Sequence, residues 1–214
     1  MKDYRIVFEK TGLMRYISHL DLNRCMIRAI RRSGLPAWYT EGFHPHMYLM
    51  FPLALSLGAE SLCEMMDIRL TEEVPEEEIL RRLNASLPVG LHATQVREPK
   101  NVTQDIGSAV YTVELAGDDL PAVWEQFLTQ PEILVEKKTK KGMKTVDIRP
   151  QITCEAAEPT PDGLCLTLRL PAGNEGNLNV SVVTDALAAF AERPVQVKNV
   201  CRITIFCTDG EVFS

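Results

Sequence analysis

The chain has 214 residues, of which 45% are hydrophobic and 24% are charged, and its formal net charge is −6. This is ordinary globular composition, and the length allows one or two domains. The longest apolar run, residues 47–57, is interrupted by Pro52 and Ser56 and is well short of the roughly 20 residues of a membrane span. Because no basic leader with an apolar core opens the sequence, we expect a cytoplasmic protein that is neither secreted nor inserted in a membrane.

Six cysteines are spread along the chain without a Cys-x-x-Cys pair. Several stand among strand-forming residues, so we expect reduced thiols in the core. Their spacing would not hold an iron–sulfur centre, and we expect no cofactor.

Positive charge is concentrated in two segments. Residues 15–32 carry five arginines against Asp21, and residues 137–149 carry five lysines and Arg149 against Asp147. The rest of the chain is strongly acidic. Local positive charge on an acidic body points to an anionic partner.

Hydrophobic periodicity and turn residues predict the elements of both halves. In the first half they are a strand at residues 4–9, a helix at 19–33, a hairpin of strands at 47–58 and 62–70, a helix that begins after Pro75, and a strand at 91–96. In the second half they are a strand at 109–115, a helix at 120–129, a hairpin at 132–139 and 143–148, strands at 152–157 and 164–170, a helix at 180–191 capped by Asn179, and a strand at 195–207.

This order predicts an α+β fold of two tandem ferredoxin-like βαββαβ domains with antiparallel sheets. We place the first domain at residues 1–98, a polar linker at residues 99–108, and the second domain at residues 109–214. The second domain carries an extended basic hairpin.

The helix predicted over residues 19–33 has an apolar face and an opposite arginine face. Ser18 with Asp21 resembles a capping box at its start. The arginine face consists of Arg24, Arg28, Arg31 and Arg32. Planar guanidinium groups at this density suit the phosphates of a nucleic acid. The alternative is a solvated face whose arginines pair with Asp21 and with the acidic body.

The second basic segment is predicted to be a flexible finger. Its candidates for nucleic-acid contact are Lys137, Lys138, Lys140, Lys141, Lys144 and Arg149. Lysines also occur on exposed edge strands because they prevent aggregation, so this alternative stays open. RNA binding gains support if this finger and the arginine face lie on the same side of the protein.

Two histidines, His44 and His46, are the candidates for acid–base catalysis or phosphate contact. In an extended segment both would point to one side, and a metal site with His19 or Asp21 is a weaker alternative that we do not expect. Aromatic rings beside basic groups are suited to base stacking, but such rings are equally common in a hydrophobic core. Three such rings flank the histidines: Tyr39, Phe43 and Tyr48.

Residues 171–179 precede a predicted helix N-terminus, where backbone N–H groups can bind an anion. The segment lacks the Lys-Ser/Thr of a P-loop and the glycine spacing of a dinucleotide site.

Four stretches, SHLDLNRCMIRAIRRSGLP, EGFHPHMYLMFPLALSLGAES, VEKKTKKGMKTVDIRP and LPAGNEGNLN, resemble the radical SAM-linked protein family, a bacterial domain of unknown function. The resemblance covers nearly the whole chain and implies association with a radical SAM enzyme. The chain lacks the Cys-x-x-x-Cys-x-x-Cys run of a radical SAM core, so it would be the companion of that enzyme. At the level of the fold, the tandem plan also resembles the repeat-associated RNA-binding superfamily, which includes CRISPR repeat-processing endoribonucleases.

We therefore expect an RNA-binding accessory protein that works with a radical SAM protein in RNA modification or processing and is not itself an enzyme. One alternative is a metal-independent endoribonuclease with His44 or His46 as general base and a hairpin lysine that stabilises the phosphate. Another is a protein-interaction module that binds no RNA.

Overall fold

The structure is a computed structural model in which residues 1–139, 142–173 and 176–214 are described, apart from the side chains of Lys138 and Thr139. Two of the candidate lysines, Lys140 and Lys141, lie outside the described residues. So do residues 174 and 175 of the candidate anion-binding segment.

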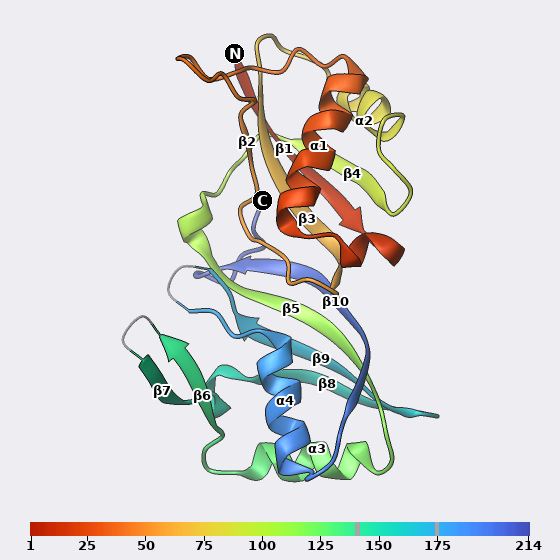
Figure 1. Ribbon diagram of the computed structural model, residues 1–214, viewed down its shortest axis with the longest axis vertical. Coiled ribbons are helices and arrows are strands. Elements are labelled where there is room, and N and C mark those ends of the chain that lie inside the picture. The colour runs from red at the N-terminus through yellow and green to blue at the C-terminus, as the bar shows by residue number, and fades with distance from the viewer. Residues whose placement is uncertain (140–141, 174–175) are drawn as a thin grey trace. The chain divides into compact units, whose positions relative to one another are not determined.

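Two compact units make up the chain, one formed by Met1–Asp105 with Val212–Ser214 and the other by Ile106–Glu211. Unit 1 contains β1 (Lys2–Lys10), the 3-10 helix η1 (Gly12–Tyr16), α1 (His19–Ser33), β2 (Leu49–Met50), β3 (Glu60–Leu70), α2 (Glu76–Asn84), β4 (Leu91–Arg97) and η2 (Thr103–Asp105). Unit 2 contains β5 (Ile106–Ala116), α3 (Leu120–Thr129), β6 (Leu134–Thr139), β7 (Gly142–Asp147), η3 (Arg149–Gln151), β8 (Thr153–Thr160), β9 (Gly163–Pro171), α4 (Val180–Phe190) and β10 (Gln196–Cys207) (Figure 1). The described residues therefore form an α+β protein with four α-helices, as the sequence predicts.

In unit 1 the strands follow the order β4-β1-β3, and β2 pairs with the outer side of β3. All three pairings are antiparallel. Ile6 of the central strand lies opposite Met66 of β3 and Val96 of β4. Alternate residues of these strands therefore form one continuous apolar face, which α1 and α2 cover.

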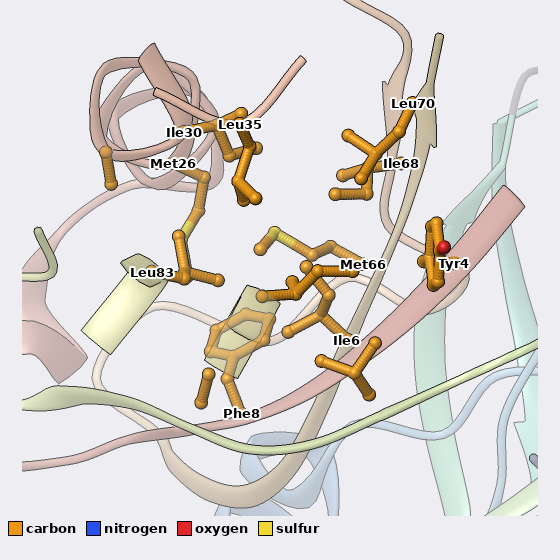
Figure 2. Close-up of a cluster of buried hydrophobic side chains, with 14 of the residues drawn as sticks. Tyr4, Ile6, Phe8, Met26, Ile30, Leu35, Met66, Ile68, Leu70 and Leu83 are labelled. Atoms are coloured by element: carbon orange, nitrogen blue, oxygen red, sulfur yellow. The ribbon is translucent and has the colours of Figure 1, made fainter. Parts of the chain in front are cut away.

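The core of unit 1 lies between this sheet face and the two helices (Figure 2). Met26 and Ile30 of α1 and Leu83 of α2 point toward Ile6 and Phe8 of β1 in Figure 2. Each of these five side chains is fully removed from solvent. Burial of such a side chain stabilises the fold by about 1.5–3 kcal/mol, so the apolar stripe of α1 is held firmly on the sheet.

The ends of α1 are those that the sequence predicts. The Ser18 hydroxyl accepts a hydrogen bond from the Asp21 backbone N–H at 3.1 Å and closes the N-terminus. Gly34 adopts the left-handed conformation with φ of 66° and ends the helix. A Cβ at this glycine would stand 2.9 Å from Nη2 of Arg82, so the position is restricted both by backbone angle and by space.

In unit 2 the strand order is β10-β5-β9-β8, again with antiparallel pairings. Trp124 and Phe127 of α3 and Leu187 of α4 are buried against leucines of β9. The hairpin β6–β7 forms a separate two-stranded ribbon. Its base is fixed by Asp147, whose carboxylate accepts hydrogen bonds from the backbone N–H groups of Ile133 and Arg149.

Four details differ from the predicted elements. The strand expected at residues 47–58 is reduced to Leu49–Met50, because Pro52 has no N–H for a ladder and Phe51 instead packs against the ring of Phe8. The strand expected at residues 62–70 begins two residues earlier, at Glu60, and Leu62 within it is exposed. The first strand of unit 2 begins at Ile106, three residues earlier than predicted. In the described part of the chain, the Asn179 side chain makes no capping hydrogen bond to α4.

All six cysteines are free thiols, but only Cys201 and Cys207 are buried, and the other four are half-buried. None of the helices within the described residues is long and apolar enough to cross a membrane.

A buried ion pair ties distant parts of unit 1 together. Arg5 of β1 donates from Nε and Nη2 to the two carboxylate oxygens of Asp67 on β3, each at 2.7 Å. The same guanidinium donates to the main-chain oxygens of Asn101 and Ser214 and lies 4.4 Å from the ring centroid of Phe213. The guanidinium thus makes four hydrogen bonds, two of them to the carboxylate, and these stabilise the buried charge.

We expect Arg5→Met to lower the free energy of unfolding by about 3–5 kcal/mol, because it leaves the Asp67 carboxylate buried without a partner. Urea unfolding followed by circular dichroism measures this loss. The matched control is Arg81→Met, which removes an exposed arginine paired with Glu78 and should leave the free energy of unfolding nearly unchanged. Equal losses in the two variants would contradict a structural role for the buried pair.

Candidate functional site

The arginine face of α1 lies on the water side of the helix. Arg24, Arg28, Arg31 and Arg32 are all exposed, whereas Leu22, Met26, Ala29 and Ile30 are buried. The two sets alternate along the helix with a spacing of three or four residues, which places them on opposite sides. Packing on the sheet therefore turns all four guanidinium groups outward.

Arg24 has a carboxylate partner, but the pair is weak. Its Nη1 lies 3.2 Å from Oδ1 of Asp21, and both side chains are 58% exposed. A hydrogen bond from the Ser18 hydroxyl, with a smaller contribution from Arg24, lowers the pKa of Asp21. Asp21 thus serves mainly to cap the helix, and its exposed pair with Arg24 holds that arginine only loosely.

Arg32 has a structural task at the end of the neighbouring helix. Its Nη2 donates to the main-chain oxygen of Ser86, just after α2, at 2.7 Å. In the opposite direction, Arg82 of α2 donates from Nε to the main-chain oxygen of Ser33 at the end of α1, at 2.9 Å. Each helix therefore has its last carbonyls covered by an arginine of the other helix.

Among the described residues, three of the four arginines have no ion-pair partner. No carboxylate oxygen of the described residues lies within 4 Å of Arg28, Arg31 or Arg32. The alternative in which the acidic body neutralises the arginine face is thus not observed in this part of the chain. Positive charge that the fold leaves without a counter-ion is available to an external anion.

A hairpin-like segment, residues 37–48, follows α1 and is joined to β3. The Trp38 backbone N–H donates to the carbonyl of Arg69, and the N–H of Tyr48 donates to the carbonyl of Trp38. Closer to the tip, the Thr40 N–H donates to the carbonyl of His46. We call this segment the aromatic hairpin; in Figure 1 it is part of the orange chain that follows α1 and leads into β2.

Two arginines hold the rings at the base of the aromatic hairpin. Arg31 of α1 donates from Nε to the Tyr39 hydroxyl at 3.1 Å and lies 5.8 Å from the centroid of that ring. Arg69 of β3 lies 5.3 Å from the Trp38 ring and 4.9 Å from the Tyr48 ring. The structure thereby brings the arginine face and the aromatic hairpin together through Arg31 and Tyr39.

The sequence reasoning overlooked Arg69 and Trp38. Nothing in the local sequence indicates that Trp38, about thirty residues before Arg69, lies beside it. The Arg69 guanidinium is held by two hydrogen bonds to Asp3 of β1, at 2.6 and 2.8 Å. These bonds lower the pKa of the Asp3 carboxyl.

The two candidate histidines lie at the exposed end of the aromatic hairpin. Nδ1 of His46 lies 3.0 Å from the Thr40 hydroxyl, and the His46 N–H donates to the same hydroxyl oxygen. No polar contact of the His44 ring is observed within the described residues. No group of three or more His, Cys, Asp or Glu side chains in these residues is arranged to hold a metal ion.

The basic hairpin β6–β7 places like charges opposite each other. Lys137 and Lys144 are exposed and occupy the same cross-strand position. Such a pair is mutually repulsive, and a bound anion would relieve the repulsion. Arg149, by contrast, donates from Nε to the carbonyl of Leu128 near the end of α3, so part of its guanidinium is engaged within unit 2.

The basic hairpin also borders a cavity of about 320 Å³. Its apolar wall includes Val135, Val146 and Val182, and Lys137 donates from Nζ to the carbonyl of Asn177 at 3.2 Å. The candidate anion-binding segment at residues 171–179 is therefore in contact with the basic hairpin through Asn177.

We expect Asp3→Asn to lower the free energy of unfolding by less than about 1 kcal/mol at pH 7, because the pair with Arg69 is partly exposed. The pKa of Asp3 is lower in the folded than in the unfolded protein, so its contribution is complete above about pH 4 and is lost as the pH falls through the folded value. Urea unfolding should therefore show a larger difference between the two proteins at pH 7 than at pH 2. A difference of the same size at pH 2 would contradict the assignment.

Residues 3–180 match the model of a family described as an uncharacterized protein conserved in bacteria, DUF2344. No curated protein matches the chain. The matched range contains α1, the aromatic hairpin and the basic hairpin β6–β7. Since it takes in far more than half of the chain, the protein belongs to the bacterial family DUF2344.

Proposed function

We propose that this protein is an RNA-binding accessory protein and that the exposed face of α1, with the aromatic hairpin beside it, forms its RNA-binding surface. The observation that carries the proposal is the set of exposed guanidinium groups at Arg28, Arg31 and Arg32 without a carboxylate within 4 Å in the described residues. Guanidinium groups bind phosphate in a planar, bidentate manner.

RNA explains both components of this surface. Arginine contacts to phosphate supply affinity that does not depend on sequence. Aromatic rings and arginine planes supply surfaces on which bases can stack. An acidic protein partner would use the same arginines and rings, and a lack of RNA binding in the titrations described below would favour such a partner.

The basic hairpin is proposed as a second phosphate contact within unit 2. The cross-strand position of Lys137 and Lys144 supports this assignment, because it concentrates positive charge on one hairpin, although Lys137 also donates to the carbonyl of Asn177. Arg149 and the remaining lysines of the segment belong to the same proposal, with Arg149 partly engaged at the end of α3.

The strand orders support a tandem ferredoxin-like plan. In unit 1 the order is β4-β1-β3 with β2 beyond β3, and in unit 2 it is β10-β5-β9-β8. In each unit the first and third strands are central and the fourth pairs with the first, as in a split βαβ fold. We infer that residues 1–98 and 109–214 are two ferredoxin-like domains, the second with β6–β7 inserted after α3. Their likeness to the repeat-associated RNA-binding superfamily is an analogy of fold.

We further propose that a radical SAM protein is the partner that performs the chemistry. This part rests on the resemblance of the stretches around α1 and the aromatic hairpin to radical SAM-linked proteins. This protein would bind the RNA in the cytoplasm, and the radical SAM protein would modify the bound RNA.

The endoribonuclease alternative gains no support from the histidine environment. A general base must lie within hydrogen-bonding reach of the proton it removes and is commonly oriented by a further polar group. His46 is oriented by Thr40, a loop contact, and no carboxylate or lysine of the described residues contacts either His44 or His46. Incubation of total cellular RNA with the purified protein, which should leave the RNA intact, tests this alternative.

The double variant Arg24→Glu/Arg28→Glu tests the RNA-binding surface without touching the helix-end contacts of Arg32 and Arg82. We expect its affinity for a fluorescein-labelled RNA to fall by at least about tenfold and its salt dependence to become shallower by about one unit per lost phosphate contact. Fluorescence anisotropy titrations at several NaCl concentrations measure both quantities.

Lys198→Glu is the matched control for charge. Lys198 is an exposed lysine of β10 whose ion pair with Asp162 already occupies it. The control changes the net charge in the same sense at one site but should leave the affinity within about twofold. The proposal fails if the wild-type protein binds no RNA at low salt, or if the arginine variant binds as tightly as the wild type.

A further inference from the structure

The tip of the aromatic hairpin carries a fully exposed phenylalanine. The side chain of Phe43 is 102% exposed, the highest value among the exposed large hydrophobic residues. Its neighbours Glu41, Gly42, His44 and Pro45 are exposed as well. The ring therefore contributes nothing to either hydrophobic core, although a phenylalanine offers 150–250 Å² of surface for burial, roughly.

The base of the hairpin below this ring is well fixed. Tyr39 and Met47 form an antiparallel bridge, and Met47 is buried. The hydroxyl of Thr40 is linked to both the backbone N–H and the ring of His46. An exposed ring on a braced support loses little conformational freedom when it binds, which favours its use as a contact residue.

The same hairpin is attached to the arginine face. Arg31 contacts Tyr39 by a hydrogen bond and by its position over the ring. A phosphate backbone that follows the arginines of α1 therefore leads to the hairpin that carries Phe43. Arginine charge at the base of the hairpin and an exposed ring at its tip are the two components that proteins combine to bind single-stranded nucleic acids.

We propose that Phe43 stacks on an unpaired base, so that the protein recognises single-stranded or looped-out RNA. This inference rests on the RNA-binding function proposed above and specifies the form of the RNA. Inside an A-form duplex each base face is covered by the neighbouring bases, and the deep major groove does not admit side chains. A ring at a loop tip has a partner only where a base is unstacked.

The test compares two RNA probes with the full-length protein and its variants. The probes are a labelled single-stranded RNA of mixed sequence and a labelled duplex that contains the same strand. Phe43→Ala should reduce affinity for the single strand by about 5- to 150-fold, the effect of losing one stacked base. Its affinity for the duplex should stay within about twofold of the wild-type value, and Phe43→Trp should retain single-strand binding.

Leu13→Ala is the matched control, because Leu13 is another strongly exposed apolar residue of unit 1, at 83% exposure. It should bind both probes like the wild type. Since Phe43 touches no core residue, thermal unfolding of Phe43→Ala should match that of the wild type, which separates binding from folding.

The possible failures are distinguishable. If the arginine variant loses affinity but Phe43→Ala binds the single strand like the wild type, the RNA-binding function stands and the stacking role is wrong. If Phe43→Ala weakens both probes equally, Phe43 contacts RNA without reading an unpaired base, and the inference is again wrong. If the wild-type protein binds neither probe at low salt, the proposed function and the inference fall together.

Discussion

The apolar stripe of α1 can be buried only on the face of the sheet formed by β4, β1 and β3, and this constraint determines the direction of every arginine on the helix. Met26 and Ile30 are fully buried in the core with Ile6 and Phe8. Rotation of the helix by half a turn would expose those side chains and bury guanidinium groups without counter-ions, at a cost of many kcal/mol. The charged surface is therefore a direct consequence of core packing, and the buried pair between Arg5 and Asp67 keeps the strands beneath it in register.

The exposed arginines of α1 differ in the contacts that they make. Arg24 is loosely paired with Asp21, and Arg32 covers the end of α2. Arg31 reaches the aromatic hairpin through Tyr39, and Arg28 has no contact partner in the described residues. A surface built only for solubility would require none of these connections. The link from α1 to the hairpin instead joins a charged surface to an exposed ring, and both are features that RNA can use: the charge through phosphate and the ring through an unpaired base.

The elements that local signals mark were predictable from the sequence. Ser18, Asp21 and Gly34 delimit α1 at the predicted residues, and Asp147 closes a hairpin whose lysines were recognised. Features that depend on distant pairing were not predictable. Arg69 meets Trp38 because β3 pairs with a segment about thirty residues earlier, and Arg5 and Asp67 become buried because Phe213 and Asn101 return to the first strand. The capping role of Arg32 likewise depends on how α1 packs against α2. For the candidate site, the sequence identified the four arginines of α1 and the rings of Tyr39, Phe43 and Tyr48. It did not identify Trp38 or Arg69, nor which side chains contact one another.

The most direct test of RNA binding at the arginine face and the aromatic hairpin is ultraviolet crosslinking of the wild-type protein to RNA, followed by mass spectrometry of the crosslinked peptides. Aromatic side chains that stack on bases crosslink efficiently, so the method needs no substitution of the surface in question. If RNA binds there, nucleotides should be crosslinked to residues of the aromatic hairpin, chiefly Phe43, and to the peptide that contains the arginine face of α1. Crosslinks confined to other parts of the chain, or none at RNA concentrations that saturate binding, would contradict it.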